Sequence, residues 1–362
     1  MKKTIKLGLA SAVTAAMLIG CGGGSDSPTG PTGPQSISDL ANSAANQALV
    51  DNVIDNVIVS GYTALHMQSE TLTTALDTLA ATATQQDLDA AQRQWRTTRI
   101  PWESGEGHIF GPVDSLGVDP AVDSWPVDRT ELDGSLSGWN VGESVDGFPD
   151  EQKGFHAIEY ILFGDGTTTN TRPIGSLTPK QLAYVAALGA SMESEMKTLV
   201  DAWTVSFDGG PAYTDTFKGF SVASATEELM GGLIGIVDEV GVGKMGDPFN
   251  DRDTTLVESQ FSWNSTTDFM NNIISVKNVW EAGLDELIAK IDTETAATIT
   301  TQINDAIAKI IAISDSNADG QIDVNDKDVA FRNQITDPAG RVLIQAAITA
   351  LAELQASLES IQ

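Results

Sequence analysis

The sequence predicts an all-α protein. Apolar residues recur at steps of three and four over long segments, which is the repeat of a helix that buries one face. No run of residues shows the alternation of apolar and polar side chains that is typical of half-buried strands. We therefore expect packed antiparallel helices joined by polar connections.

The helical patterns can be placed in order along the chain. The first runs from Ser38 to Ala80. The second covers Leu88 to Arg99 and should end or kink near Pro101, because proline cannot donate a helical hydrogen bond. A third starts at Thr178-Pro179, a capping residue followed by a first-turn proline, and runs to about Trp203. Later patterns cover residues 223–240, 256–291, 296–313 and 338–361.

The N-terminus has the features of a lipoprotein export signal. Three lysines precede an apolar stretch, residues 7–19, that is too short to span a bilayer comfortably. The stretch ends in Leu-Ile-Gly-Cys21, the pattern of a bacterial lipobox, and Cys21 is the only cysteine in the chain. An ordinary signal peptide with a chance cysteine is the alternative. We expect a signal peptide at residues 1–20, cleavage before Cys21 and attachment of lipid to its thiol.

The residues that follow the predicted cleavage site indicate a tether and the membrane to which the protein is anchored. Residues 21–36 are rich in Gly, Pro, Ser and Thr and should form a flexible tether, followed by a folded body at residues 37–362. Gly22 stands where an aspartate would signal retention in the inner membrane. The sequence therefore predicts a protein anchored through Cys21, at the outer membrane and facing the periplasm.

The net charge of the chain limits the classes of partner that it can bind. There are 50 acidic and 20 basic residues, and the formal net charge is −30. Such a chain repels nucleic acid and anionic lipid surfaces. The balance suits a cation-binding or saline-exposed protein, although for most acidic residues solubility alone is a sufficient explanation.

Two segments are not simple helices. Residues 111–154 are rich in Gly, Pro, Asp and Trp, and a connection of that length is usually functional. Residues 314–327 resemble a calcium-binding loop, in which six to eight oxygens surround a hard cation. Gly320 holds the position of the sharp turn, and Gln321 would contribute its backbone carbonyl. The remaining oxygens come from Asp315, Asn317, Asp319, Asp323 and Asp326. An ordinary acidic turn is the alternative to a structural calcium site.

A histidine and several carboxylates form a candidate metal site. His156 and Glu159 are three residues apart and would share one helix face, which suits a transition metal. A surface pair of His and Glu is the simpler alternative. A zinc-protease helix would need a second histidine, and neither His66 nor His108 is at helical spacing from His156.

Further polar residues could complete that site. Glu103 and Glu106 repeat the three-residue spacing, and Asp128 adds a carboxylate from the long connection. A polar face would border them, made of Arg99, Glu258, Ser259, Ser262 and Asp268. Trp95, Trp102 and Trp125 favour packing over ligand contact.

These segments resemble the imelysin-like family. The sequence GFHAIEYILFG is similar to its G-x-H-x-x-E signature, and blocks around 99–112, 125–128 and 258–272 match other family segments in the same order. The resemblance covers residues 37–362, with the calcium-like loop as an insertion. It implies two four-helix-bundle halves with shared residues between them, a place in the cell envelope and a link to iron acquisition. On this resemblance His156 and Glu159 carry the signature, Glu103 and Glu106 the paired acids, and Asp128 the acid of W-P-x-D.

Three functions follow from these observations. The first is an envelope-anchored metal-binding lipoprotein for iron binding or uptake, working with an uptake or outer-membrane partner. Its ligands would be Glu103, Glu106, Asp128, His156 and Glu159, with iron favoured over zinc. The second is a metallopeptidase of the imelysin type, which we rank lower. The third is a non-catalytic protein that binds a partner, with the polar cluster serving as an internal hydrogen-bond network.

Overall fold

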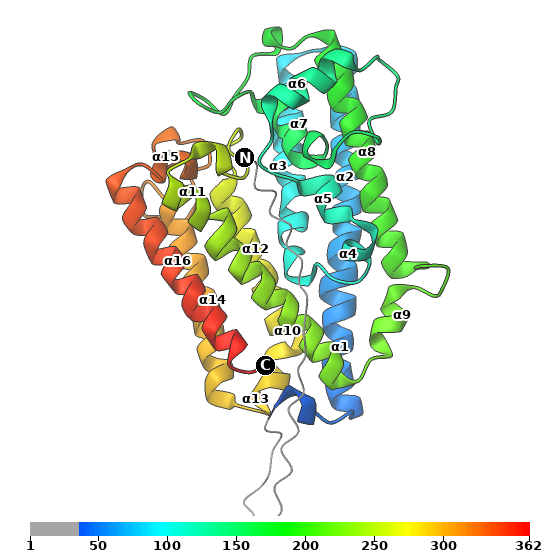
Figure 1. Ribbon diagram of the computed structural model, residues 1–362, viewed down its shortest axis with the longest axis vertical. Helices are drawn as coiled ribbons and strands as arrows, with labels where there is room; N and C mark the ends of the chain where they lie inside the picture. Colours follow the sequence, from blue (N-terminus) through cyan, green and yellow to red (C-terminus); the bar gives the residue numbers. More distant parts are fainter. Residues whose placement is uncertain (1–35) are drawn as a thin grey trace, which may run out of the picture. The chain divides into compact units, whose positions relative to one another are not determined.

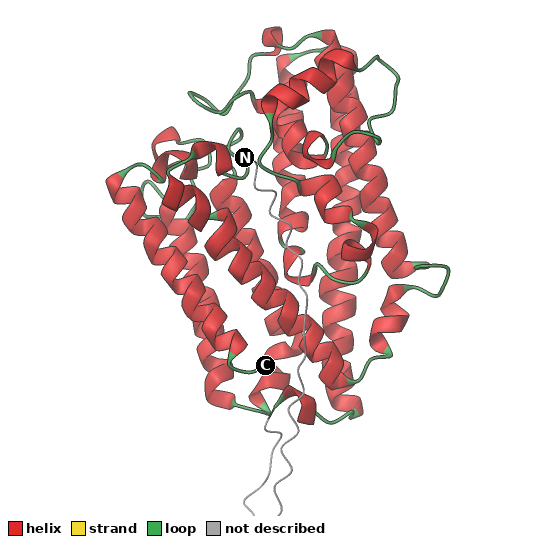
Figure 2. Ribbon diagram, in the orientation of Figure 1, coloured by secondary structure: helices red, strands yellow, loops and turns green. Residues whose placement is uncertain are grey.

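The computed structural model describes residues 36–362, and every regular element in that range is a helix (Figure 2). The predicted all-α class is confirmed. The export signal at residues 1–20, Cys21 and the tether up to residue 35 lie outside the described residues.

Four helices form a first bundle: α2 (Ser60–Thr82), α3 (Gln85–Glu103), α7 (Gly154–Phe163) and α8 (Pro179–Thr204) (Figure 1). Helix α2 packs against α3 and α8, and α7 closes the bundle by packing against the same two helices. The helical spacing of apolar residues explains this arrangement, because each helix turns its stripe inward. The buried side chains include Leu65, Leu72, Leu76, Leu88, Trp95, Ile158 and Leu188.

The expected start of α8 and the expected end of α3 near Pro101 both agree with the structure. Helix α8 begins with a capping box, in which Thr178 and Gln181 bond each other's backbone N–H, and Pro179 occupies its first turn. Helix α3 continues through Pro101 and ends two residues later at Glu103.

A second bundle is built from α10 (Val222–Asp238), α12 (Ser265–Val279), α14 (Thr293–Ile313) and α16 (Pro338–Glu359). Helix α14 packs against α12 and α16, and α10 packs against the same two helices. Helix α16 is long and apolar enough to cross a membrane. In this structure one face of it packs into the second bundle, where Ile344, Leu351 and Leu354 are fully buried against its neighbours.

Two of the longer helical patterns are interrupted in the structure. The first contains η1 (Ile37–Asp39), α1 (Ala44–Val53), a π-helical turn η2 (Ile54–Val59) and α2. The pattern predicted at 256–291 becomes helical only at Ser265. Residues 257–264 form an irregular segment because Ser259 and Trp263 adopt left-handed backbone conformations, with φ of 49° and 62°. After α12 the chain passes through a π-helical turn η8 (Trp280–Leu284) into α13 (Asp285–Ala289).

Short helices make up most of the connections. The long segment between α3 and α7 contains α4 (Pro112–Leu116), α5 (Val118–Asp123) and α6 (Arg129–Gly138). The other short elements are η3 (Glu106–His108), η4 (Asp150–Gln152), η5 (Ile174–Ser176), α9 (Tyr213–Lys218), η6 (Glu239–Lys244), α11 (Gly246–Asp251), η7 (Thr254–Leu256), η9 (Lys327–Val329) and α15 (Phe331–Gln334).

The two bundles meet along α12 and α10. Helix α12 packs against α3 and η3, and α10 packs against η3. The approach is close, because a Cβ atom at Gly232 of α10 would lie 2.4 Å from the carbonyl oxygen of Gly107 in η3. This contact brings the end of α3 and the whole of η3 against the polar start of α12.

Candidate functional site

A buried cluster of charged residues lies where the bundles meet, and Arg99 is at its centre. Arg99 and Glu103 are one turn apart on α3 and form an ion pair. The same guanidinium pairs with Asp123 at the end of α5, and lies 2.9 Å from Glu258 Oε1 and 3.5 Å from Asp268 Oδ2. One arginine therefore joins residues from both bundles.

Lys244 is the second buried cation of the cluster. It lies on the π-helical turn η6, with its Nζ 2.9 Å from Glu106 Oε2 and 3.2 Å from Glu258 Oε1. Glu103 and Glu239 are within 4 Å of the same nitrogen. Its ammonium also lies 5.0 Å from the ring centre of the half-buried Trp125.

His156 and Glu159 share one face of α7, as their spacing predicts. The His156 Nδ1 atom lies 3.0 Å from Glu159 Oε2, while Glu159 Oε1 accepts the backbone N–H groups of Phe261 and Ser262 at 3.0 and 2.7 Å. Glu159 is thus fully occupied and fixes the orientation of the imidazole. The Nε2 atom of His156 is left facing Asp123 Oδ1 at 3.1 Å and Glu258 Oε1 at 3.7 Å.

A close contact between α5 and α7 brings Asp123 to His156. Gly154 begins α7 with a φ of +68°, and a Cβ atom there would lie 2.1 Å from the carbonyl oxygen of Val122. Only glycine allows this approach, which explains the glycine of the G-x-H-x-x-E pattern. Trp102 then holds Asp123 by donating its indole N–H to Oδ2 at 2.7 Å.

Asn272 of α12 connects the paired acids. Its side-chain nitrogen donates to Glu103 Oε2 and Glu106 Oε2, both at 2.6 Å. Glu103, Glu106 and Asp123 each offer an oxygen within 4.8 Å of the others. Asp123, His156 and Glu258 form a second group under the same limit, so Asp123 belongs to both.

Carboxylates outnumber cations in the cluster. Within the described residues, Arg99 and Lys244 are buried cations at its centre, and His156 adds a third because its pKa is raised. Arg96 and the buried Arg332 approach from the edge with their N–H groups on Asn264 and backbone carbonyls. Asp119 and Glu239 add two partly covered carboxyl groups. The buried carboxylates are Glu103, Glu106, Asp123, Glu159, Glu258 and Asp268. Burying like charges together is costly unless a cation or a proton neutralises them.

The pKa values of these groups are shifted by burial and by the excess of carboxyl groups over cations. Burial raises the pKa of Glu106 well above its usual range, that of Asp119 to about 7 and that of Asp268 to about 6. Burial also lowers the pKa of His156, but the neighbouring carboxylates of Asp123, Glu159 and Glu258 outweigh it, so that this pKa is well above its usual value. For Asp123, burial acts upward, but Arg99 and His156 hold its pKa below the usual range.

A small cavity adjoins His156 and Glu159. It has a volume of about 10 Å³, roughly the room for one water molecule, and its other lining residues are Trp125, Pro126, Val127, Val257, Ser259, Gln260 and Phe261. Nε2 of His156 pairs with Asp123 Oδ1 at 3.1 Å, and Oε2 of Glu258 has no hydrogen-bond partner within residues 36–362. An imidazole nitrogen among carboxylate oxygens is a set of donors that a first-row transition metal accepts when it replaces the proton on the imidazole. The residues therefore fit a metal ion of that class.

Most predicted site residues lie in this cluster, and one does not. Glu103, Glu106, His156 and Glu159 are all buried there, and so is the predicted polar face of Arg99, Glu258, Ser259, Ser262 and Asp268. Asp128, which was predicted to be a metal ligand, lies outside the cluster. It is exposed and caps α6 by accepting the N–H groups of Thr130 and Glu131. Asp123, five residues earlier, supplies the carboxylate instead.

Asp123, Lys244 and Asn272 are cluster residues that the sequence reasoning missed. Lys244 carried a signal, because it is an isolated cation within the apolar and glycine-rich segment VGVGKMG. Asn272 is on α12 next to the recognised polar positions. Asp123 could not be distinguished by sequence, because residues 111–154 contain several other acidic residues and α5 is only six residues long.

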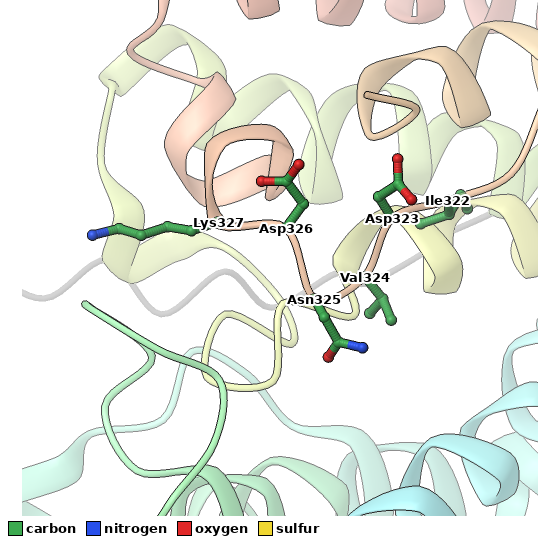
Figure 3. Close-up of a pocket in the computed structure, with 6 residues that line it drawn as sticks. All are labelled: Ile322, Asp323, Val324, Asn325, Asp326 and Lys327. Atoms are coloured by element: carbon green, nitrogen blue, oxygen red, sulfur yellow. The ribbon is translucent and has the colours of Figure 1, made fainter. Parts of the chain in front are cut away.

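The calcium-like loop lies in the second bundle, between α14 and η9. Asp315 accepts the backbone N–H groups of Asn317, Asp319 and Gly320, so that the chain wraps around its carboxylate. Gly320 has a φ of +82°, as the sharp turn requires. Figure 3 shows the end of the loop, where the carboxylates of Asp323 and Asp326 extend from the same stretch of chain. Asp326 also accepts the N–H of Asp328 and caps η9.

Known proteins share this sequence and architecture. The chain is 30% identical over 256 residues to iron-regulated protein A of Synechococcus elongatus. This alignment covers 67% of this chain and 68% of that protein. A crystal structure of a chain described as an iron-regulated protein A precursor, from Parabacteroides distasonis, superposes with a TM-score of 0.75 at 25% identity. It covers 90% of this chain and 98% of that one.

A second solved structure supports the fold alone. An imelysin-like protein of Psychrobacter arcticum superposes with a TM-score of 0.66 at 14% identity, over 89% of this chain and 95% of that one. The imelysin family profile matches residues 58–358, a range that includes both bundles and the whole buried cluster. The chain therefore belongs to the imelysin family.

Proposed function

We propose that this protein binds iron in the buried cluster and serves iron binding or uptake at the cell envelope. The observation that carries the proposal is the excess of buried carboxylates around His156 Nε2, which lies within 4 Å of both Asp123 and Glu258. A bound cation neutralises part of that charge, and a set of oxygens with one imidazole suits iron. The similarity to proteins described as iron-regulated supports iron as the cargo.

The ligands we propose are Asp123, His156 and Glu258, with Glu103 and Glu106 adjoining through the shared Asp123. Glu159 acts differently. Because its oxygens are taken by His156 Nδ1 and two backbone N–H groups, it orients the imidazole, as partners of metal-bound histidines commonly do.

A pair of aspartate variants tests the proposal. Asp123→Asn removes a proposed ligand, whereas Asp128→Asn makes the same change on the exposed cap of α6. We expect ferrous and ferric iron, titrated by calorimetry, to bind Asp123→Asn at least tenfold more weakly than the wild type. Asp128→Asn should bind like the wild type. Equal affinity in all three proteins, with thermal unfolding showing each folded, contradicts the proposal.

The anchor and the partner complete the proposed role. We propose lipid on Cys21, a position in the outer membrane facing the periplasm, and transfer of iron to an uptake partner in the same envelope. The lipobox and the tether-like segment support this location. In cells, Cys21→Ala should move the protein from the membrane to the soluble fraction. If the distribution is unchanged, the anchor is not Cys21.

We also propose that the loop at residues 314–327 binds calcium as a structural ion. Asp315 organises the loop through three backbone N–H groups, and the oxygens of Asn317, Asp319 and Asp323 follow at the calcium-binding spacing. Calcium should raise the melting temperature of the wild type but not of Asp315→Asn. Asp305→Asn, on the exposed face of α14, is the control. An equal calcium effect in the wild type and Asp315→Asn contradicts this role.

A further inference from the structure

A second group of metal-ligating side chains lies on the outside of the first bundle. His66 and Glu70 are one turn apart on α2 and point from the same face. Glu193 faces them from α8, the helix against which α2 packs. One ligand atom from each of the three lies within 4.8 Å of the other two. None of these residues belongs to the buried cluster.

The packing of the two helices fixes this arrangement. Gly189 of α8 is at a close crossing, because a Cβ atom there would lie 2.6 Å from Leu76 Cδ1 of α2. Glu193 follows Gly189 by one helical turn, and on α2 the positions of Glu70 and His66 precede Leu76. Ligands carried on two rigid helices are held more accurately than ligands carried on loops.

The group has negative charge that no described residue balances. Within residues 36–362, the side chains of His66, Glu70 and Glu193 make no hydrogen bond or ion pair. Lys197, one turn beyond Glu193 on α8, is 2.5 Å from Asp201 and serves that residue instead. Glu70 is exposed and the other two residues are half-buried, so an ion can reach all three from solvent.

We propose that His66, Glu70 and Glu193 bind a divalent first-row transition cation of the zinc class. An imidazole with two carboxylates matches the ligands that such ions take, and three protein ligands leave positions for water. Calcium and magnesium are not favoured, because both prefer oxygen ligands alone. The bound ion joins α2 to α8 on the outside of the first bundle. This site stands independently of the iron proposal, since it shares no residue with the buried cluster.

Zinc titration of the purified protein by calorimetry tests the site. His66→Gln and Glu193→Gln each remove one ligand. Glu195→Gln, two residues further along α8 and on a different face of the helix, removes the same charge without touching the group. We expect His66→Gln and Glu193→Gln to lose one zinc equivalent, or to bind it at least tenfold more weakly. Glu195→Gln and Asp123→Asn should keep that equivalent.

Two further readouts make the outcome decisive. All variants should melt close to the wild type without metal, because the substitutions remove no hydrogen bond or ion pair within residues 36–362. Zinc should then raise the melting temperature of the wild type and of Glu195→Gln more than that of His66→Gln. Unchanged zinc stoichiometry and affinity in both ligand variants, or an equal loss in Glu195→Gln, overturns the site.

Discussion

At the scale of single residues, the cluster divides into groups that offer atoms to an ion and groups that hold others in place. His156 Nε2 faces the proposed ligands Asp123 and Glu258, whereas both oxygens of Glu159 are engaged by His156 Nδ1 and two backbone N–H groups. The H-x-x-E pattern thus contributes one ligand and one orienting group. Sequence spacing could not distinguish these roles, since it predicted only that both residues share a helix face.

Glu159→Gln tests the orienting role. The amide oxygen can still accept the two backbone N–H groups, but its nitrogen would face His156 Nδ1 as a donor. We expect iron affinity to fall by roughly 10- to 100-fold, the usual effect of losing such a partner, with the fold retained. Glu151→Gln, on an exposed residue, is the control for charge. If iron binding to Glu159→Gln matches the wild type by calorimetry, Glu159 does not orient the ligand.

His108 gives a pH dependence that is separate from the cluster. Burial lowers its pKa from the ordinary 6.5 to about 4, and its Nδ1 lies 2.9 Å from the Tyr62 hydroxyl. Between those two pH values the unfolded chain binds more protons at this site than the folded chain, so the free energy of unfolding falls as the pH falls. The loss is up to about 3 kcal/mol for this one group.

Urea unfolding from pH 7 to pH 4 measures this effect. The wild type should lose more stability over that range than His108→Gln, which cannot be protonated there. The comparison between the two proteins matters because carboxyl groups with raised pKa, such as Asp268, act in the opposite direction. Parallel pH profiles would show that His108 is not kept neutral by folding.

At the scale of elements, the site depends on where helices α5 and α7 touch. The two helices are short, and at their contact Gly154 lies against the backbone of Val122. This contact sets the distance between Asp123 and His156. Residues 257–264 have a similar role, because their irregular backbone presents two N–H groups to Glu159.

Gly154→Ala should destabilise the protein and weaken iron binding. The added Cβ meets the Val122 carbonyl at 2.1 Å, and the positive φ adds strain of about 1 kcal/mol, so we expect a loss of roughly 2–4 kcal/mol in urea unfolding. Gly117→Ala separates the two causes, because Gly117 has a φ of +65° with open space around it. It should lose only about 1 kcal/mol. Equal losses would mean that the contact between α5 and α7 is not what Gly154 provides.

At the scale of the whole molecule, the helices were predictable and their irregularities were not. Periodic apolar residues placed α8, α14 and α16 within a few residues, because long amphipathic helices carry a strong signal. The late start of α12 was missed, because Ser259 and Trp263 adopt left-handed conformations that their residue types do not announce. Asp128 was predicted and Asp123 was not for a related reason: which aspartate of a loop is buried depends on tertiary contacts.

Iron bound in the cluster should also raise the stability of the whole folded protein, because it neutralises part of the buried negative charge. A ligand that binds only the folded state stabilises it by about 2.7 kcal/mol at a free concentration one hundred times its dissociation constant. Iron should therefore raise the melting temperature of the wild type, measured by calorimetric scanning, and raise it much less in Asp123→Asn. The same increase in both proteins would place the bound iron outside the cluster.

The proposed iron ion lies between the two bundles at Asp123, His156 and Glu258. Anomalous X-ray diffraction from iron-soaked crystals, recorded on both sides of the iron absorption edge, locates bound iron without reference to any variant. We expect an anomalous peak within bonding distance of His156 Nε2 and carboxylate oxygens of Asp123 and Glu258. Iron peaks confined to the protein surface, with the cluster showing none at full soaking, would contradict it.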